Sequence, residues 1–323
     1  MQEASSLVRD LAPDSQAFLK HVIEGLSAEQ KWLSPMYLYD RRGSELFDRI
    51  CELPEYYPTR TELSIMEAHV PEMARAIGRD ALVIEPGSGS GLKTHRLLSA
   101  LEAPVAYVPV EISRQHLLES ASQLRKQFPA VEILPLCADF TRAFDIPRPT
   151  QRAQRRIVYF PGSTIGNFGP QEARTLLGHL AETVGAEGGM LIGVDLRKDR
   201  ESLERAYDDS QGITAQFNLN LLQRMNRELQ ADFDLEAFSH RATWNETDSR
   251  IEMHLVSKRE QSVTIDAHVF HFASGEYILS ECSYKFTLAG FAHLARQAGW
   301  QVTQVWTDPD ERFSVQFLEH PAS

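Results

Sequence analysis

A glycine-rich segment, Ile84-Glu85-Pro86-Gly87-Ser88-Gly89-Ser90-Gly91-Leu92-Lys93-Thr94, has the residue types of a ligand site. It follows the apolar run 81–84 and precedes a segment with helical spacing. Because glycine has no side chain, the backbone can turn sharply there and approach a bound molecule closely. The segment is therefore either a ligand-binding loop or a tight turn between a strand and a helix.

Three classes of cofactor bind loops of this kind, and the spacing distinguishes between them. A nucleotide-phosphate loop needs glycine directly before Lys-Thr, where this sequence has Leu92. A dinucleotide fingerprint needs GxGxxG, whereas Gly87, Gly89 and Gly91 are spaced GxGxG. The remaining pattern, Glu85-x-Gly87-x-Gly89, is typical of the first motif of S-adenosylmethionine enzymes. The loop therefore favours S-adenosylmethionine as the cofactor.

Acidic residues follow the next two predicted strands. Glu111 ends the run 105–110, roughly 20 residues beyond the loop, where a carboxylate is well placed to bind ribose hydroxyls. Asp139 follows the third strand, where its carboxyl can accept the adenine amino group while Phe140 packs beside the ring. Each acidic residue alone could be an ordinary solvated side chain. Together with the loop they lie at three successive strand ends, which favours adenosyl binding.

Short apolar runs alternate with helical segments between residues 81 and 195, and these elements would position the three strand ends. Strands are expected at 81–84, 105–110, 131–136, 156–160 and 190–195, with helices at 114–128 and 173–184. This alternation predicts parallel βαβ units with right-handed crossovers. A doubly wound sheet of that kind binds its ligand at the carboxyl ends of its strands.

The segments on either side of this region have other patterns. Before it, apolar residues at a spacing of three or four predict a helix over 63–77, and Thr59 with Glu62 fits a capping box. After it, a helix carries Phe217, Leu221, Met225 and Leu229, and strands are expected at 250–256, 262–272 and 277–286. The last forty residues predict a helix at 288–298 and a hairpin of strands 301–306 and 313–318.

An antiparallel hairpin at the end of a parallel sheet is a common end to class I methyltransferase folds. The expected fold is therefore an α/β, class I (Rossmann-like) methyltransferase with a doubly wound, mostly parallel sheet. Residues 62–198 and 285–323 would form the S-adenosylmethionine-binding domain. Residues 1–61 and 199–284 would form a second, substrate-binding domain.

The composition excludes several classes of protein. With 42% hydrophobic and 24% charged residues, the 323-residue chain has an ordinary globular composition. A net charge of −12 argues against nucleic acid as a partner, and no apolar run is long enough for a membrane helix. The N-terminal residues have no apolar core, and the three cysteines are far apart, so a cytoplasmic protein with free thiols is expected. The eleven histidines form no metal-binding motif, so no metal site is expected. The protein is expected to be a monomer that acts on a small molecule.

Further motifs extend from about residue 37 to the end of the chain. They are Leu53–Glu62, Gly162–Asn167, Ala206–Thr214, Asn226–Leu229, Arg250–Met253, Glu281–Phe286 and Trp306–Asp308. In these motifs the chain resembles the ergothioneine-pathway histidine Nα-methyltransferases, which convert L-histidine to hercynine, its trimethylbetaine, with three molecules of S-adenosylmethionine. The resemblance implies the same fold, cofactor and reaction.

The resemblance also implies roles for the cofactor residues. Gly87 and Lys93 would contact S-adenosylmethionine, Glu111 its ribose, and Asp139 with Phe140 its adenine. The family often has aspartate where this chain has Glu111, but glutamate can still bridge two hydroxyls. The loop 90–92 also differs from the corresponding loop of the mycobacterial-type members. This difference would alter the affinity for the cofactor but involves none of the substrate residues.

A second group of roles concerns the amino-acid head of the substrate. The resemblance implies that Tyr56, Asn167 and Tyr207 hold it, while Gly162 and Thr214 support that pocket, Thr214 through a water molecule. Asn167 and a tyrosine hydroxyl suit a reacting amine because they exchange hydrogen bonds without placing a fixed charge beside a sulfonium. We therefore expect Asn167, Tyr207 and a third residue, Tyr39, which would line the site, to be the catalytic residues.

The side chain of the substrate would be held by Glu281 and Ser283, with Met253 packed over it. Residues two apart in a strand share a face, so Leu279, Glu281, Ser283 and Lys285 would form one row. A carboxylate and a hydroxyl on one face can pair with the two nitrogens of an imidazole.

Taken without the resemblance, these residues have ordinary alternatives. Glu281 and Ser283 could belong to an exposed polar strand face, Met253 to a core, and Tyr56 to simple packing. Two rival functions also stay open: an N-methyltransferase of another aromatic amino acid such as tryptophan, and a non-catalytic ligand-binding relative. A nicotinamide oxidoreductase is disfavoured by the glycine spacing.

Overall fold

A computed structural model describes residues 9–11, 15–89 and 91–321 of the chain. Residues 1–8, where no signal peptide is expected, and Ser90 of the glycine loop lie outside this range. The chain divides into two compact units. Unit 1 takes in the described residues within Met1–Ala12, Pro58–Arg197 and Lys285–Ser323, and unit 2 those within Pro13–Tyr57 and Lys198–Tyr284.

Unit 1 is built on one large sheet with the strand order β1-β5-β3-β2-β6-β7-β14-β13, and β4 pairs with β3. The strands are β1 (Arg9–Leu11), β2 (Ala81–Pro86), β3 (Ala106–Glu111), β4 (Glu132–Ile133), β5 (Leu136–Ala138), β6 (Arg155–Phe160), β7 (Gly189–Asp195), β13 (Gln301–Thr307) and β14 (Phe313–Glu319). Neighbours from β1 to β7 are parallel, whereas β14 is antiparallel to both β7 and β13. The doubly wound, mostly parallel sheet is thereby confirmed.

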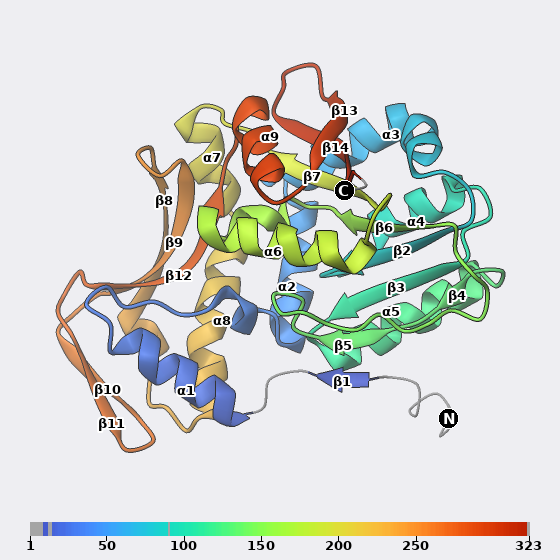
Figure 1. The fold of residues 1–323 in the computed structure, drawn as a ribbon. Helices are drawn as coiled ribbons and strands as arrows, with labels where there is room; N and C mark the ends of the chain where they lie inside the picture. The colour runs from blue at the N-terminus through green and yellow to red at the C-terminus, as the bar shows by residue number, and fades with distance from the viewer. Residues whose placement is uncertain (1–8, 12–14, 90, 322–323) are drawn as a thin grey trace. The chain divides into compact units, whose positions relative to one another are not determined.

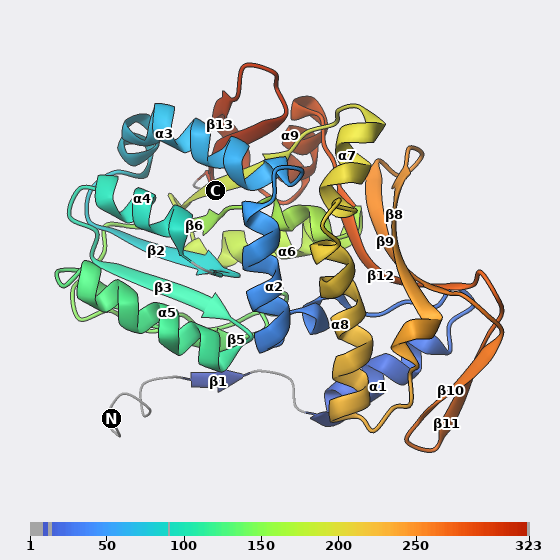
Figure 2. The same ribbon diagram turned by 180° about the vertical axis from the view of Figure 1, so that it is seen from behind.

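Helices cover both faces of this sheet. They are α3 (Tyr57–Ile77), α4 (Leu92–Ala100), α5 (Arg114–Gln127), α6 (Pro170–Val184) and α9 (Leu288–Gln297), with the short η3 (Thr164–Asn167). Helices α6 and α9 lie in front of the sheet in Figure 1, and α3, α4 and α5 lie on the opposite face, seen in Figure 2. Because both faces are covered, β2 and β7 are buried along their whole length, as their continuous apolar runs predict.

Unit 2 combines a three-stranded antiparallel sheet, in the order β12-β9-β8, with a separate hairpin. Its strands are β8 (Phe238–Asn245), β9 (Arg250–Ser257), β10 (Gln261–Ile265), β11 (His268–Phe272) and β12 (Tyr277–Tyr284). Its helices are α1 (Ser15–Leu26), η2 (Pro35–Leu38), α2 (Arg41–Glu52), α7 (Arg200–Tyr207), α8 (Ile213–Glu228) and η4 (Leu235–Ala237). Helices α7 and α8 pack on β8 and β9 and share one hydrophobic core with α1 and α2.

The structure corrects several predicted boundaries. Residues 262–272 form the hairpin β10–β11 and not one strand, because Asp266 turns the chain with a φ of 52°. Residues 131–136 contain β4 and the start of β5. The N-terminal region was expected to belong wholly to the second domain, but β1 pairs with β5 in unit 1.

Two expectations about polar side chains are also wrong. Glu62 caps no helix, since α3 begins at Tyr57 and the Glu62 side chain is buried inside unit 1. The predicted row on β12 does not continue at either end: a register shift separates Leu279 from Glu281, and Lys285 lies beyond the strand. A bulge adds a residue to one strand, which changes the face of every side chain before it.

Candidate active site

The glycine loop of unit 1 runs from the end of β2 to the start of α4. Gly87, Gly89 and Gly91 have φ values of 69°, 48° and 74°, the left-handed region that favours glycine. A Cβ at Gly87 would stand 3.5 Å from the ring of Phe140. Glycine at this position therefore keeps the gap between the loop and this ring open, and we call this gap between Gly87 and Phe140 the cradle.

The two predicted acidic residues, Glu111 at the end of β3 and Asp139 directly after β5, have distinct surroundings. Glu111 accepts hydrogen bonds from the backbone N–H groups of Ile112, at 2.8 Å, and Ser113, at 3.4 Å. Burial raises the pKa of Glu111, and these N–H groups partly oppose the rise. Asp139 accepts from the backbone and the hydroxyl of Thr141, at 2.9 and 2.6 Å, which fixes one carboxylate oxygen.

The ring of Phe140 is held by two others in edge-on contact. Its centroid lies 5.9 Å from that of Phe160 and 6.3 Å from that of Phe168. Such pairs favour one ring orientation. Phe140 is therefore a fixed wall beside Gly87, and the structure brings these two predicted cofactor residues together.

Glu85 of the glycine motif points into unit 1. Its carboxyl accepts hydrogen bonds from the hydroxyls of Thr94 and Tyr107, both at 2.6 Å, and the residue is 2% exposed. Burial raises the pKa of Glu85 to about 8, so it is mostly protonated at neutral pH. Its role in the structure is to tie the start of α4 to β3 below the loop.

Lys93 is held by a buried carboxylate that the sequence did not identify as part of the site. The Nζ of Lys93 lies 2.5 Å from Glu62 Oε2, and the same oxygen accepts the backbone N–H of Gly162 at 2.9 Å. Glu62 is 1% exposed. Glu62 is the last residue of the motif Leu53–Glu62, so the sequence did contain an indication that it belongs to the site. Glu62 thus brings Lys93 and Gly162 together.

Asn167 ends the short helix η3, which follows Gly162. It is half-buried, and no hydrogen bond joins its amide to another residue in the described part of the chain. The turn before it is braced: Ser163 has a φ of 59° and its Oγ accepts the backbone N–H of Asp195 at 2.9 Å. Asp195 in turn pairs with Lys285 at 2.7 Å, and both side chains are fully buried.

In unit 2, Glu281 and Ser283 lie on one buried face of β12. They are 8% and 4% exposed, so an exposed polar strand face is excluded. Glu281 stands opposite Met253 of β9, which is 2% exposed and belongs to the core of the unit. The two polar side chains and the Met253 thioether therefore meet on one side of the sheet.

Two of the three predicted tyrosines, Tyr207 and Tyr56, lie near this face. The Tyr207 hydroxyl lies 2.8 Å from Ser283 Oγ, and the Tyr207 ring is 6.0 Å from that of Tyr56 in an edge-on arrangement. Burial raises the pKa of the Tyr56 hydroxyl well above its ordinary value, and the nearby Tyr207 adds to the rise. A neutral Tyr56 hydroxyl can donate and accept hydrogen bonds at any physiological pH.

Two phenylalanines that the sequence did not single out complete this aromatic cluster. Phe47 of α2 lies 6.2 Å from Tyr56 and 5.6 Å from Tyr39, and Phe217 of α8 lies 5.5 Å from Tyr39. Phe217 was predicted only as part of an apolar helix face. Its spacing gave no indication that it would meet Tyr39.

Thr214 is the second residue of the helix α8. Its backbone N–H donates to Asp209 Oδ1 at 2.7 Å, and Asp209 also accepts from the backbone of Ile213 at 3.0 Å. Thr214 Oγ1 is buried and has no hydrogen-bond partner within residues 9–11, 15–89 and 91–321. A buried orphan oxygen of this kind fits the predicted contact through water.

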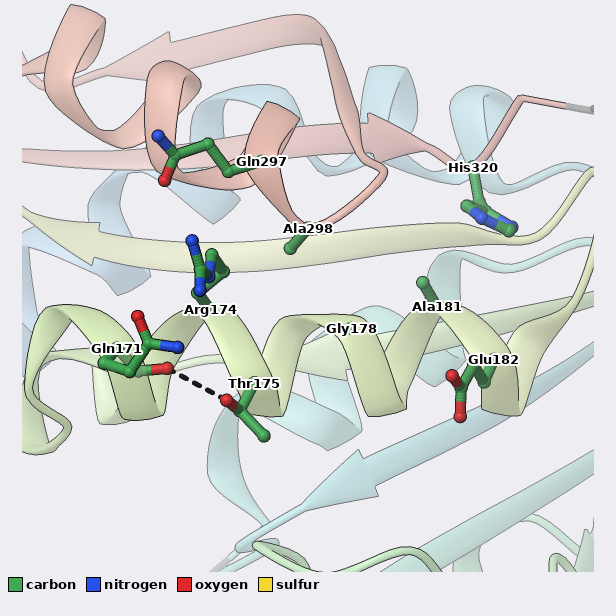
Figure 3. A pocket seen from close by; sticks show the side chains of 9 residues that line it. All are labelled: Gln171, Arg174, Thr175, Gly178, Ala181, Glu182, Gln297, Ala298 and His320. Carbon is green, nitrogen blue, oxygen red and sulfur yellow. Dashed lines mark hydrogen bonds between the residues drawn. The ribbon is translucent and has the colours of Figure 1, made fainter.

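A surface hollow elsewhere on unit 1 holds none of the predicted site residues. It has a volume of about 390 Å³ and lies between α6 and α9, with Arg174, Gln297 and His320 among its walls (Figure 3). Among the described residues, no three His, Cys, Asp or Glu side chains are grouped as metal ligands. No helix of the described ranges has both the length and the hydropathy needed to cross a bilayer.

The fold and the loop together define the class of the protein. A doubly wound sheet closed by the antiparallel β14, with a glycine loop after β2 and carboxylates at the ends of β3 and β5, is the architecture of a class I S-adenosylmethionine-dependent methyltransferase. A model of the family described as "Histidine-specific methyltransferase, SAM-dependent" matches residues 18–320. The chain therefore belongs to the S-adenosylmethionine-dependent, histidine-specific methyltransferases, and the predicted family and cofactor are confirmed.

Similar proteins of known name agree with this assignment. The chain is 42% identical to the Histidine N-alpha-methyltransferase of Mycolicibacterium smegmatis, over 96% of this chain and 98% of that protein. It is also 42% identical to the Histidine N-alpha-methyltransferase of Mycobacterium tuberculosis, over 93% of this chain and 94% of that one. Ergothioneine biosynthesis protein 1 of Neurospora crassa is 35% identical over 60% of this chain, which corresponds to 22% of that longer protein.

Proposed function

We propose that this methyltransferase converts the α-amino group of L-histidine to the trimethylammonium of hercynine, the first step of ergothioneine biosynthesis. The observation that carries the proposal is the buried pair Glu281 and Ser283, with Tyr207 in hydrogen-bond contact with Ser283. The names of the similar proteins support the same substrate and pathway.

The buried pair suits an imidazole because it offers both an acceptor and a donor. Glu281 would accept the N–H of the ring. If Tyr207 donates to Ser283, the Ser283 O–H would be available to donate to the second ring nitrogen. An indole has one N–H and no second nitrogen, so tryptophan would form one hydrogen bond fewer with this pair than histidine. The lost hydrogen bond lowers affinity, which is the basis for discrimination against tryptophan.

The other end of the substrate would meet Tyr56, Tyr39 and Asn167. The α-amino group must be neutral to attack, but its pKa is about 7.7–8.0 in model peptides and is higher beside the free carboxylate of an amino acid. The site must therefore favour the neutral form of the amine. The tyrosine hydroxyls and the Asn167 amide would orient the lone pair of that neutral amine. The rings of Phe47 and Phe217 beside Tyr39 give an apolar wall against which added methyl groups and the final cation can pack.

Unit 1 would hold the cofactor, and unit 2 the histidine. Gly87 and Lys93 would contact S-adenosylmethionine, Glu111 its ribose hydroxyls, and Asp139 with Phe140 its adenine. When bound, this cofactor supplies a methyl group on a sulfonium, activated for in-line transfer. The protein's own contribution is then mainly position, since aligned reactants at near-attack distance remove much of the barrier. We further propose that the enzyme acts in the cytoplasm as a monomer.

The test is incubation of the enzyme with S-adenosylmethionine and each amino acid in turn, with products followed by mass spectrometry. We expect histidine to gain one, two and then three methyl groups. Methylation of tryptophan or another amine in place of histidine would refute the substrate. Binding of both ligands without any methyl transfer would favour the non-catalytic alternative.

A further inference from the structure

His240 on β8 is a buried histidine of unit 2 that has no part in the proposed reaction. Its side chain is 1% exposed, and its Nε2 lies 2.8 Å from the backbone carbonyl oxygen of Tyr207. Tyr207 is the last residue of α7, and the last carbonyls of a helix have no partner within the helix. His240 therefore satisfies a helix-end carbonyl that belongs to a proposed substrate-binding residue.

The hydrogen bonds of Asn218 determine where the His240 proton lies. Asn218 Nδ2 is 2.9 Å from His240 Nδ1 and 3.2 Å from the backbone carbonyl oxygen of His254. The carbonyl oxygen of His254 can only accept, so the Asn218 atom that faces it must be the NH₂ group. If the amide were turned around, its own oxygen would face this carbonyl oxygen and repel it. This fixes the amide even though Asn218 Oδ1 has no partner among the described residues. His240 Nδ1 is then an acceptor, so Nε2 carries the proton and donates it to Tyr207.

We propose that neutral His240, set in this tautomer by Asn218, is a positioning residue that fixes the backbone of Tyr207 and so directs its hydroxyl at Ser283. The inference rests on the proposed function, in which Ser283 holds the imidazole of the substrate. Tyr207 is held at two points: its carbonyl by His240 and its hydroxyl by Ser283. Loss of the first contact frees the end of α7 and lowers the affinity for histidine without touching the cofactor residues of unit 1.

The arrangement also predicts a dependence on pH. Burial lowers the pKa of His240, while the Tyr207 carbonyl and then Asp208 and Asp209 partly oppose this. The carboxylate of Asp208 is 4.0 Å from Nε2. Protonation would keep the Nε2–H bond to Tyr207 but turn Nδ1 into a second donor facing the NH₂ of Asn218, and this repulsion would push the ring out of position. Because the pKa of His240 is lowered, we expect histidine affinity to fall only at a pH below the ordinary histidine value of 6.5.

The other charged groups on this part of the sheet surround His254, which is the next histidine in the network. His254 Nε2 lies 3.0 Å from Glu252, and its Nδ1 lies 3.3 Å from Arg241. Burial lowers the pKa of His254 too. A titration of the whole protein would contain both histidines, so the test must observe His240 itself.

The first experiment is a ¹⁵N NMR pH titration of histidine side chains, with the His240 signal assigned by its loss in His240→Gln. We expect the Nε2–H tautomer at pH 7 and a titration below the ordinary histidine value of 6.5. His268, which is exposed on the β10–β11 hairpin, is the control position for the variants. A charged His240 or an Nδ1–H tautomer at pH 7 would overturn the inference. This readout does not depend on catalysis, so a wild-type enzyme that leaves histidine unmethylated would overturn the proposed function separately.

The second experiment compares His240→Phe, which keeps a ring but no polar atom, with His240→Gln and the control His268→Phe. We expect His240→Phe to raise the KM for histidine by about tenfold, as for loss of a buried hydrogen bond, with cofactor affinity within about twofold of wild type. Gln should restore most of the loss because it has both a donor and an acceptor. An unchanged KM, or an equal loss of cofactor affinity, would show that His240 positions nothing.

If His240→Phe does not fold, Asn218→Asp provides the same test. A carboxylate at that place would accept from a protonated Nδ1 and stabilise the charged imidazole. We expect the acid limb of kcat/KM for histidine to move to higher pH. A limb that coincides with that of the wild type would contradict the proposed link between His240 and substrate affinity.

Discussion

Removing the Glu281 carboxylate is the most direct test of how the substrate is recognised. We predict that Glu281→Ala weakens histidine binding strongly and leaves cofactor binding unchanged. A hydrogen bond to a charged group contributes about 1.5–3 kcal/mol, and about 1.4 kcal/mol corresponds to a tenfold change in affinity. The Kd for histidine should therefore rise by roughly 10- to 150-fold. Since Glu281 is only 8% exposed, solvent screens little of this interaction.

The size of the side chain lets two variants separate charge from shape. Glu281→Gln keeps the volume and one acceptor oxygen, so its loss should be smaller than that of Glu281→Ala. In the alanine variant a water molecule can enter the vacated space and accept the imidazole N–H, which places the expected loss toward the lower end of the range. Glu260, exposed in the loop after β9, gives a matched control through Glu260→Ala.

The assay is calorimetric titration of each variant with L-histidine and, separately, with S-adenosylhomocysteine, after thermal unfolding has shown that the variant is folded. We expect Glu260→Ala to match the wild type with both ligands. If Glu281→Ala loses affinity for both ligands equally, or for neither, then Glu281 does not hold the imidazole. The buried face of β12 would then be a structural feature of unit 2.

Three further predictions concern unit 1. Glu85 has a pKa raised by burial to about 8, so the stability that this group contributes is complete below its ordinary value of 4.5 and is lost as the pH rises through 8. Glu85→Gln mimics the protonated form at every pH. In urea unfolding, the free energy of unfolding should therefore fall less between pH 5 and pH 9 in this variant than in the wild type; an identical pH dependence of the two proteins would contradict this. Glu62→Gln weakens the anchor of Lys93 and should raise the Kd for S-adenosylhomocysteine about tenfold, as measured by calorimetry; an unchanged Kd would show that this anchor is not used. Gly87→Ala places a methyl group 3.5 Å from the Phe140 ring at a φ of 69°, so it should cost about 1–2 kcal/mol of stability in urea unfolding and weaken cofactor binding; unaltered binding would show that the cradle is not used.

Fully apolar segments were the most reliable guide to the fold. The strands predicted at 81–84, 156–160 and 190–195 fall within β2, β6 and β7, because strands buried on both faces need continuous apolar side chains. The errors lie where a single residue changes the geometry. Asp266 turns 262–272 into a hairpin, and the bulge after Leu279 shifts the faces of β12. Neither a turn at one residue nor a bulge alters the hydrophobic pattern enough to be seen.

The sequence alone determined the class of the molecule, because local spacing specifies the elements of a doubly wound sheet and its glycine loop. It also pointed to the residues proposed for both ligands, through motifs shared with a known family. Only the tertiary structure decided that Glu281 and Ser283 are buried, that Glu62 anchors Lys93, and that Asn218 sets the tautomer of His240. These contacts join residues that are far apart along the chain. Local periodicity carries no information about such pairs, whose burial and hydrogen bonds arise only when the elements pack.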